Sequence, residues 1–158
     1  MSENDAVRSK KEKTVAIPLL FGDFEASEAI ASNLISKHHH ELSGAKFKHL
    51  CRNKAASAGG EKIPGSIKKA SPMEKHICGD VDFILTVALD VWNDLSVNQR
   101  TALIDHLLTR CVAVEDPKNG EMKYKVRPPQ VQEFPEIVER YGSWNEGLVE
   151  MNACFKDK

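Results

Sequence analysis

The sequence lacks the long apolar runs, the signal-like segment and the paired cysteines that mark several classes of protein. No run approaches the roughly 20 apolar residues of a membrane-spanning helix. The first residues, MSENDAVRSKKEK, contain no hydrophobic core of a secretory signal. The four cysteines form no C-x-x-C pair and are expected to be reduced thiols, and the segment AGGEK lacks the spacing of a phosphate-binding loop. We therefore expect a cytoplasmic protein without membrane contact.

Length and composition predict one soluble domain with short tails. The chain has 158 residues, of which 41% are apolar and 28% charged, and this balance excludes collagen, coiled coil and wholesale disorder. Residues 1–13 are charged and show no periodicity, so a disordered tail is expected there. A single domain is expected over residues 14–150, with a C-terminal tail at residues 151–158.

The net charge of −1 conceals an uneven distribution of charge. Residues 37–76 carry nine Lys or Arg against three Asp or Glu, a balance of +6, whereas residues 77–158 carry nine against fourteen, a balance of −5. The basic segment suits a phosphate backbone or an acidic protein, although a merely solvated lysine-rich surface has the same composition. Its candidate binding residues are Lys46, Lys48, Arg52, Lys54, Lys68 and Lys69.

Alternation of apolar and polar residues predicts a small set of strands. They are expected at residues 45–51, 61–69 and 82–89, and in a hairpin over residues 112–126. The stretch 82–89 is nearly continuously apolar, which predicts the most buried strand. Pro64 and Gly65 interrupt the stretch 61–69, so that strand is expected at an edge of the sheet or with a bulge.

Helical spacing predicts three helices, which begin near residues 23, 96 and 135. Asp23 is expected to cap the first, which should end near Lys37. Ser96 and Gln99 form a capping-box pair at the start of the second. The third should end near Tyr141. These elements predict an α+β fold, with a small mixed sheet packed against about three helices and a β-hairpin between the last two.

The segment TALIDHLLTRC contains a lone histidine on the second predicted helix. Zincin metallopeptidases carry H-E-x-x-H on one helix, where two histidines four residues apart bind zinc and the glutamate acts as general base. His106 occupies the first ligand position of that motif, whereas Leu107 replaces the glutamate and Arg110 the second histidine. By itself, a single histidine on an amphipathic helix indicates only a surface or boundary residue.

Several longer blocks strengthen this comparison. They are HHHEL, GAKFKHLCRNKAASAGG, KKASPMEKHICGDVDFILTVALDVWNDLSVNQRTALIDHLL and RPPQVQEFPEIVERYGSWNEGL. In this order they resemble the putative phage metallopeptidase family, a group of small zincin-like proteins of phages and prophages. The resemblance implies a zincin-like fold with the full H-E-x-x-H motif and a third histidine in an R-x-H-D context.

The sequence departs from that family at the positions that carry the chemistry. The third ligand position is Pro129, within Arg127-Pro128-Pro129-Gln130, so one of three expected ligands remains. We therefore expect no catalytic residue, no metal and no cofactor, with His106, Leu107, Arg110 and Pro129 as vestiges of the site. Leu107 is expected to fill the former pocket. Arg110 is expected either to replace the zinc charge, for instance by pairing with Asp105 or Glu133, or to point to solvent.

A fold that is retained without its metal ligands and general base suggests a pseudo-metallopeptidase that acts through its surface. We expect a non-catalytic phage or prophage accessory protein in the cytoplasm of a bacterial host. It would bind and block or redirect a host macromolecule, such as a defence or nucleic-acid-processing component, and its partner would be a host or phage protein. One alternative is a nucleic-acid-binding module that uses the basic segment. Another is a residual zinc metallopeptidase with recruited ligands, for which the candidates are His38, His39, His40, His49, His76 and Cys78.

Overall fold

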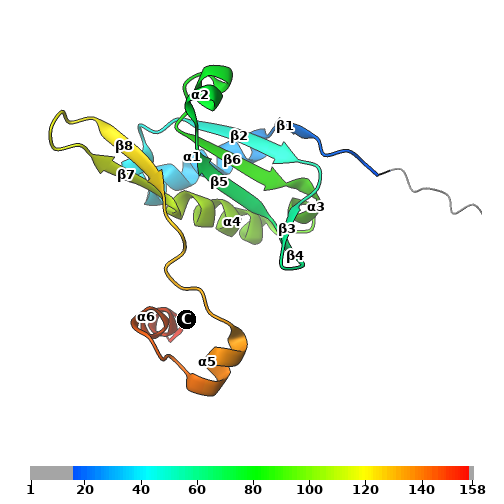
Figure 1. The fold of residues 1–158 in the computed structure, drawn as a ribbon, viewed down its shortest axis with the longest axis vertical. Helices are drawn as coiled ribbons and strands as arrows, with labels where there is room; N and C mark the ends of the chain where they lie inside the picture. The colour runs from blue at the N-terminus through cyan, green and yellow to red at the C-terminus, as the bar shows by residue number, and fades with distance from the viewer. Residues whose placement is uncertain (1–15, 157–158) are drawn as a thin grey trace, which may run out of the picture.

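A four-stranded mixed sheet forms the centre of the fold in the computed structural model, which describes residues 16–156 (Figure 1). Its strands are β1 (Phe21–Asp23), β2 (Phe47–Arg52), β5 (Gly65–Lys69) and β6 (Phe83–Ala88), in the order β1-β2-β6-β5. β2 and β6 are parallel, whereas β1 pairs with β2 and β5 with β6 in antiparallel fashion. The predicted α+β class with a small mixed sheet is confirmed.

Strand β6 is the most buried strand, as its sequence predicts. Five of its six residues are buried, and neighbours on both sides satisfy its backbone hydrogen bonds. The predicted strand 61–69 divides at Pro64 into β4 (Glu61–Ile63) and β5. Proline has no N–H to donate to a ladder, and β5 lies at an edge of the sheet as expected. β4 pairs instead with β3 (Ala56–Ala58).

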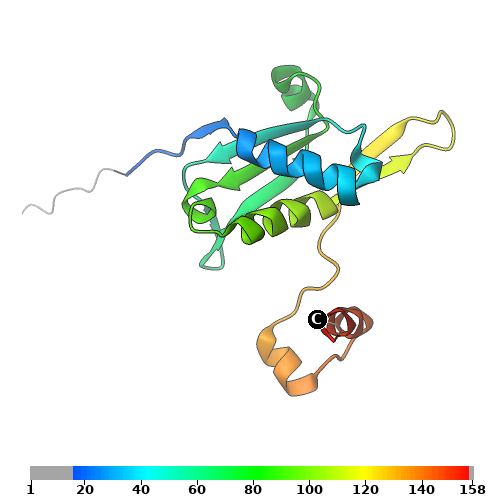
Figure 2. The same ribbon diagram turned by 180° about the vertical axis from the view of Figure 1, so that it is seen from behind.

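Helices α1 (Glu25–His38) and α4 (Val97–Thr109) lie side by side on one face of the sheet (Figure 2). α4 begins with the predicted capping box, because Ser96 and Gln99 each bond to the backbone of the other. The predicted cap of α1 is wrong. Asp23 pairs with β2 as part of β1, so Phe24 takes the N-cap position and the Asp23 carboxylate contacts Lys48 Nζ at 3.0 Å.

Short elements cover parts of the remaining surface. α2 (Pro72–Cys78) has a capping box at Ser71, and its Cys78 packs near Ile84 at one end of the other sheet face. α3 (Leu89–Trp92) follows β6 directly. The rest of that sheet face is not covered by a helix, as Figure 1 shows.

The predicted hairpin is confirmed as β7 (Cys111–Glu115) and β8 (Met122–Val126), which form a separate two-stranded sheet. Its Tyr124 packs on Phe83 with a ring separation of 5.6 Å, so the hairpin extends the core beyond the main sheet. The hairpin starts directly after α4, which brings the end of β8 back to the end of that helix.

Two helices follow the hairpin where the sequence predicted one. α5 (Pro135–Tyr141) has the predicted bounds, and α6 (Glu146–Phe155) follows it, so the hairpin lies between α4 and α5. The proposed domain end at residue 150 falls inside α6. Both helices lie away from the main sheet in Figure 1. The predicted tail at residues 1–13 lies outside the described residues. Across the described part of the chain, no helix is long and apolar enough to cross a membrane.

The close approach of β5 and α4 depends on Gly65. A Cβ at Gly65 would lie 3.1 Å from Leu107 Cδ1 and 3.2 Å from the Thr86 carbonyl oxygen. We expect Gly65→Ala to lower the free energy of unfolding by about 1–3 kcal/mol, because the backbone oxygen has little room to move. Urea unfolding measures the change. Gly44→Ala is the matched control, since its Cβ would meet only Tyr124 Oη at 3.6 Å, and its stability should not fall. Equal losses in both variants would contradict this account.

Candidate functional site

Three of the four positions that the sequence analysis compared with a zincin site come together where α4 ends. His106, Arg110 and Pro129 line one hollow of about 260 Å³. Its other lining residues are Thr109, Arg127, Pro128, Gln130 and Met151. We call this the α4–β8 hollow. The resemblance implied that the helix and the segment after the hairpin meet at one site, and the fold places them in contact.

Reciprocal hydrogen bonds fasten the two sides of the hollow together. The Arg127 N–H donates to the Arg110 carbonyl oxygen at 2.8 Å, and Arg110 Nε donates to the Arg127 carbonyl oxygen at 3.1 Å. Arg127 Nε donates to the Thr109 carbonyl oxygen at 3.1 Å. Both guanidinium groups are thus oriented by backbone carbonyls, Arg127 by one at the end of α4, where a cation is favoured, and Arg110 by one just after β8.

The predicted ion pairs of Arg110 are wrong. Asp105 Oδ1 lies 2.6 Å from His39 Nε2, and Glu133 accepts a hydrogen bond from Trp144 Nε1 at 3.1 Å. Arg110 is half-buried. The backbone oxygen of Arg127 therefore takes the place that the sequence analysis gave to a carboxylate, and Arg110 does not simply extend into solvent.

Leu107 does not fill the hollow, so that prediction is also wrong. Its side chain is 2% exposed and belongs to the core cluster with Ile104 and Leu108. Consecutive residues of an α-helix point about 100° apart. The rotation that buries Leu107 under the sheet therefore turns His106 to the exposed side of α4.

The residues of the α4–β8 hollow do not fit a zinc ion. Zinc sites in proteins use thiolate, imidazole and carboxylate ligands. The hollow offers one imidazole from His106, and its two nearest charged groups are guanidiniums, which donate hydrogen bonds and cannot coordinate a metal. Among residues 16–156, no group of three or more His, Cys, Asp or Glu is arranged to hold a metal ion.

The side chains considered as recruited metal ligands lie elsewhere in the fold. His39 directly follows α1 and is buried, and its contact with Asp105 links the end of α1 to α4. His76 and Cys78 belong to α2, and His49 belongs to β2. Cys111 is a core residue, and its burial raises the pKa of its thiol to about 12, which keeps the thiol protonated at neutral pH. None of these side chains lines the α4–β8 hollow.

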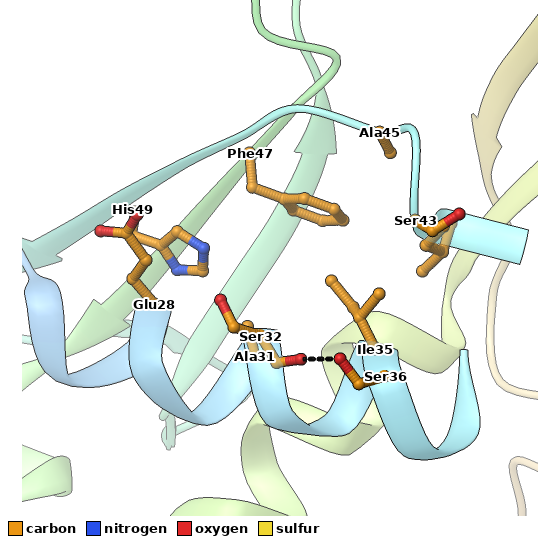
Figure 3. Close-up of a pocket in the computed structure, with 10 residues that line it drawn as sticks. Glu28, Ala31, Ser32, Ile35, Ser36, Ser43, Ala45, Phe47 and His49 are labelled. Atoms are coloured by element: carbon orange, nitrogen blue, oxygen red, sulfur yellow. Dashed lines mark hydrogen bonds between the residues drawn. The ribbon is translucent and has the colours of Figure 1, made fainter. Parts of the chain in front are cut away.

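A second hollow of about 350 Å³ lies between α1 and β2, beside His49 (Figure 3). His49 Nδ1 lies 2.9 Å from Ser27 Oγ, and that hydroxyl donates to the Phe24 carbonyl oxygen. Because its proton is directed to that carbonyl, the Ser27 oxygen can accept a hydrogen bond from His49 in the tautomer that carries the proton on Nδ1. Ser27 is fully buried, so this Ser–His contact is structural and does not provide a nucleophile.

Three of the six candidate basic residues, Lys48, Arg52 and Lys68, lie on the uncovered face of the sheet. Lys48 and Lys68 flank Ile84 in one row across β2, β6 and β5. Both lysines form ion pairs, Lys48 with Asp23 at 3.0 Å and Lys68 with Glu74 at 2.9 Å. Other members also have local contacts: Arg52 lies over the Phe21 ring, and Lys54 Nζ donates to the Ile17 carbonyl oxygen. Lys46 and Lys69 are exposed and form no ion pair with a described residue.

The buried His49 predicts a dependence of stability on pH. Burial lowers the pKa of His49 below its ordinary value, and the charge of Glu28 opposes this shift. Between the unfolded pKa, about 6.5, and the lower folded pKa, the unfolded chain binds a proton that the folded chain does not. Stability should therefore fall as the pH drops below about 6.5, by at most about 1.4 kcal/mol per pH unit from this residue.

Unfolding in urea between pH 8 and pH 5 measures this contribution. We expect His49→Gln to show a shallower loss of stability toward low pH than the wild type. His76→Gln is the control, because it removes an exposed histidine of α2, and it should keep the wild-type profile. Identical profiles for His49→Gln and the wild type would contradict the assignment.

Comparison with known proteins identifies one family whose model covers most of this chain. The family described as "Putative phage metallopeptidase" matches residues 23–154, which include the whole sheet apart from the first two residues of β1, both hollows and most of α6. No curated protein and no solved structure is significantly similar to the chain. The chain belongs to the putative phage metallopeptidase family.

Proposed function

We propose that this chain is a non-catalytic member of its family that acts by binding a macromolecule of the bacterial host. The observation that carries the proposal is the set of side chains in the α4–β8 hollow. Where a zincin requires three ligands and a general base, the hollow has His106, two arginines and Pro129. Leu107, at the position of the general base, is a core residue.

The positive charges in the hollow support this proposal as strongly as the missing metal ligands do. Arg110 and Arg127 each carry a permanent positive charge, and neither forms an ion pair with a carboxylate of residues 16–156. A divalent cation beside them would be repelled, since two unit charges 4 Å apart interact by about 4 kcal/mol near a protein surface. His106 alone would have to overcome that repulsion.

The proposed class of partner rests on the description of the family as a phage family. A phage protein that keeps a folded domain without its chemistry would act through a surface, and we propose a host defence or nucleic-acid-processing protein as its target. Binding, blocking or redirecting such a protein requires no metal. The interaction should therefore be insensitive to chelators.

We expect the purified full-length protein to contain no stoichiometric zinc. Elemental analysis measures the zinc content, and one zinc per chain that is lost in His106→Ala would show a residual metallopeptidase site. The double variant Arg110→His/Pro129→His is the positive control. It places two further imidazoles on the hollow and should gain zinc binding, because residues 106, 110 and 129 line the same space.

We also expect His106→Ala to leave the biological activity nearly unchanged. The side chain is exposed, so the stability cost should stay within about 1 kcal/mol. Capture of a host protein by the wild type and by His106→Ala, each with and without EDTA, tests the binding role. Equal capture in all four cases is expected, and loss on chelation or on substitution would mean that metal chemistry persists.

The uncovered sheet face favours a nucleic-acid-binding role as the second candidate, because Lys48, Arg52 and Lys68 project from it. A gel shift at low and high salt tests this role. Lys48→Gln/Lys68→Gln is the suitable variant, since both lysines project from this face, and Lys118→Gln in the hairpin turn is its control. The main proposal predicts no complex at low salt. A salt-sensitive complex lost only in the double variant would favour the second candidate.

A further inference from the structure

We propose that the α4–β8 hollow binds a phosphate group, either free phosphate or a small phosphate monoester. This inference rests on the proposed absence of a metal centre, because it assigns a ligand to the same hollow. It depends on the charges, hydrogen bonds and lining residues of that hollow.

The two arginines have unused donors that are already oriented. A guanidinium carries five N–H donors, and Arg110 and Arg127 each use Nε–H for a backbone carbonyl. Their terminal Nη groups make no hydrogen bond with another residue of the described chain. The bonds at Nε restrict rotation of both side chains, so less conformational entropy is lost when a ligand binds.

No carboxylate lines the hollow beside these donors. Asp105 contacts His39, and Glu133 accepts a hydrogen bond from Trp144. Glu41 lines a neighbouring hollow with Thr109 and Arg127, and its carboxylate lies 3.8 Å from His39 Nδ1. The side-chain amide of Gln130 adds a neutral donor to the lining, whereas the Thr109 hydroxyl donates its proton to the Asp105 carbonyl oxygen at 2.7 Å. The hollow is therefore a concave surface with two positive charges and no negative side chain.

Phosphate fits this arrangement better than a carboxylate or a metal ion. Arginine forks bind phosphate oxygens in a bidentate manner, and a phosphate offers enough oxygens for two forks at once. Its double charge matches the two guanidiniums. A volume of about 260 Å³ accommodates one phosphate together with a small esterified group.

Titration of the full-length protein with inorganic phosphate at pH 7.5 tests the proposal, with calorimetry as the readout. We expect saturable binding that weakens at least tenfold in Arg110→Gln and in Arg127→Gln. Arg140→Gln, which removes an exposed arginine of α5 that does not line the hollow, should bind as the wild type does. Unchanged affinity in both hollow variants would overturn the proposal.

A measurement on the wild type covers the case in which a variant fails to fold. In ¹H–¹⁵N spectra, phosphate should shift the Nε–H signals of Arg110 and Arg127 and leave those of Arg100 and Arg140 unchanged. Shifts confined to other arginines would overturn the site. Acetate at equal concentration should bind at least tenfold more weakly, and equal binding of acetate would also overturn it.

Titrations with two phosphate ligands identify the source of the phosphate group. The zinc content then separates the phosphate proposal from the proposal of a non-catalytic role. Tighter binding of glycerol 3-phosphate than of inorganic phosphate would support the site with an esterified ligand, and the reverse order would support it with the free ion. Zinc in the purified protein would refute the non-catalytic role, whether or not phosphate binds. Absence of both zinc and phosphate binding would refute only the phosphate site.

Discussion

The packing of α4 on the central strand β6 determines the position of nearly every other feature of this fold. β6 is hydrogen-bonded along both edges, and its Phe83, Leu85 and Val87 share one core cluster with Ile104 and Leu108 of α4. Each such side chain contributes about 1.5–3 kcal/mol when fully buried. That energy fixes the rotation of α4 about its axis, and the rotation decides which residues of the helix face the core and which face the hollow at its end.

This separation explains how the fold can be retained while the chemistry of its site changes. Leu107 stabilises the core, whereas His106 and Arg110 lie on the exposed side, four residues apart and on one face. Substitutions at residues 106, 110 and 129 therefore leave the packing of α4 nearly untouched. The backbone hydrogen bond from Arg127 to Arg110 holds the two sides together without help from any metal ligand. A surface-binding role and an undisturbed scaffold are thus compatible in the same chain.

The sequence predicted the elements whose determinants are local. The apolar run of β6, the capping box at Ser96 and the turn of the β7–β8 hairpin all act within a few residues. The failures depend on contacts distant in the sequence. Asp23 is a good cap in isolation, but pairing of β1 with β2 removes it from the helix end. The partner of Arg110 Nε is a carbonyl 17 residues away, which no local pattern reveals. The failed prediction for Leu107 has a local cause, because its spacing from Ile104 and Leu108 places all three on the buried side of α4.

The end of α4 also sets the balance of charge in the hollow. The final carbonyls of a helix carry about half an elementary negative charge, and here they accept hydrogen bonds from both the backbone and the guanidinium of Arg127. This partial charge stabilises the two arginines beside each other without a carboxylate. It does not cancel them, since two full positive charges exceed half a negative one. The hollow therefore remains electropositive, so it repels a divalent cation and attracts an anion, and the same arrangement disfavours zinc and favours phosphate.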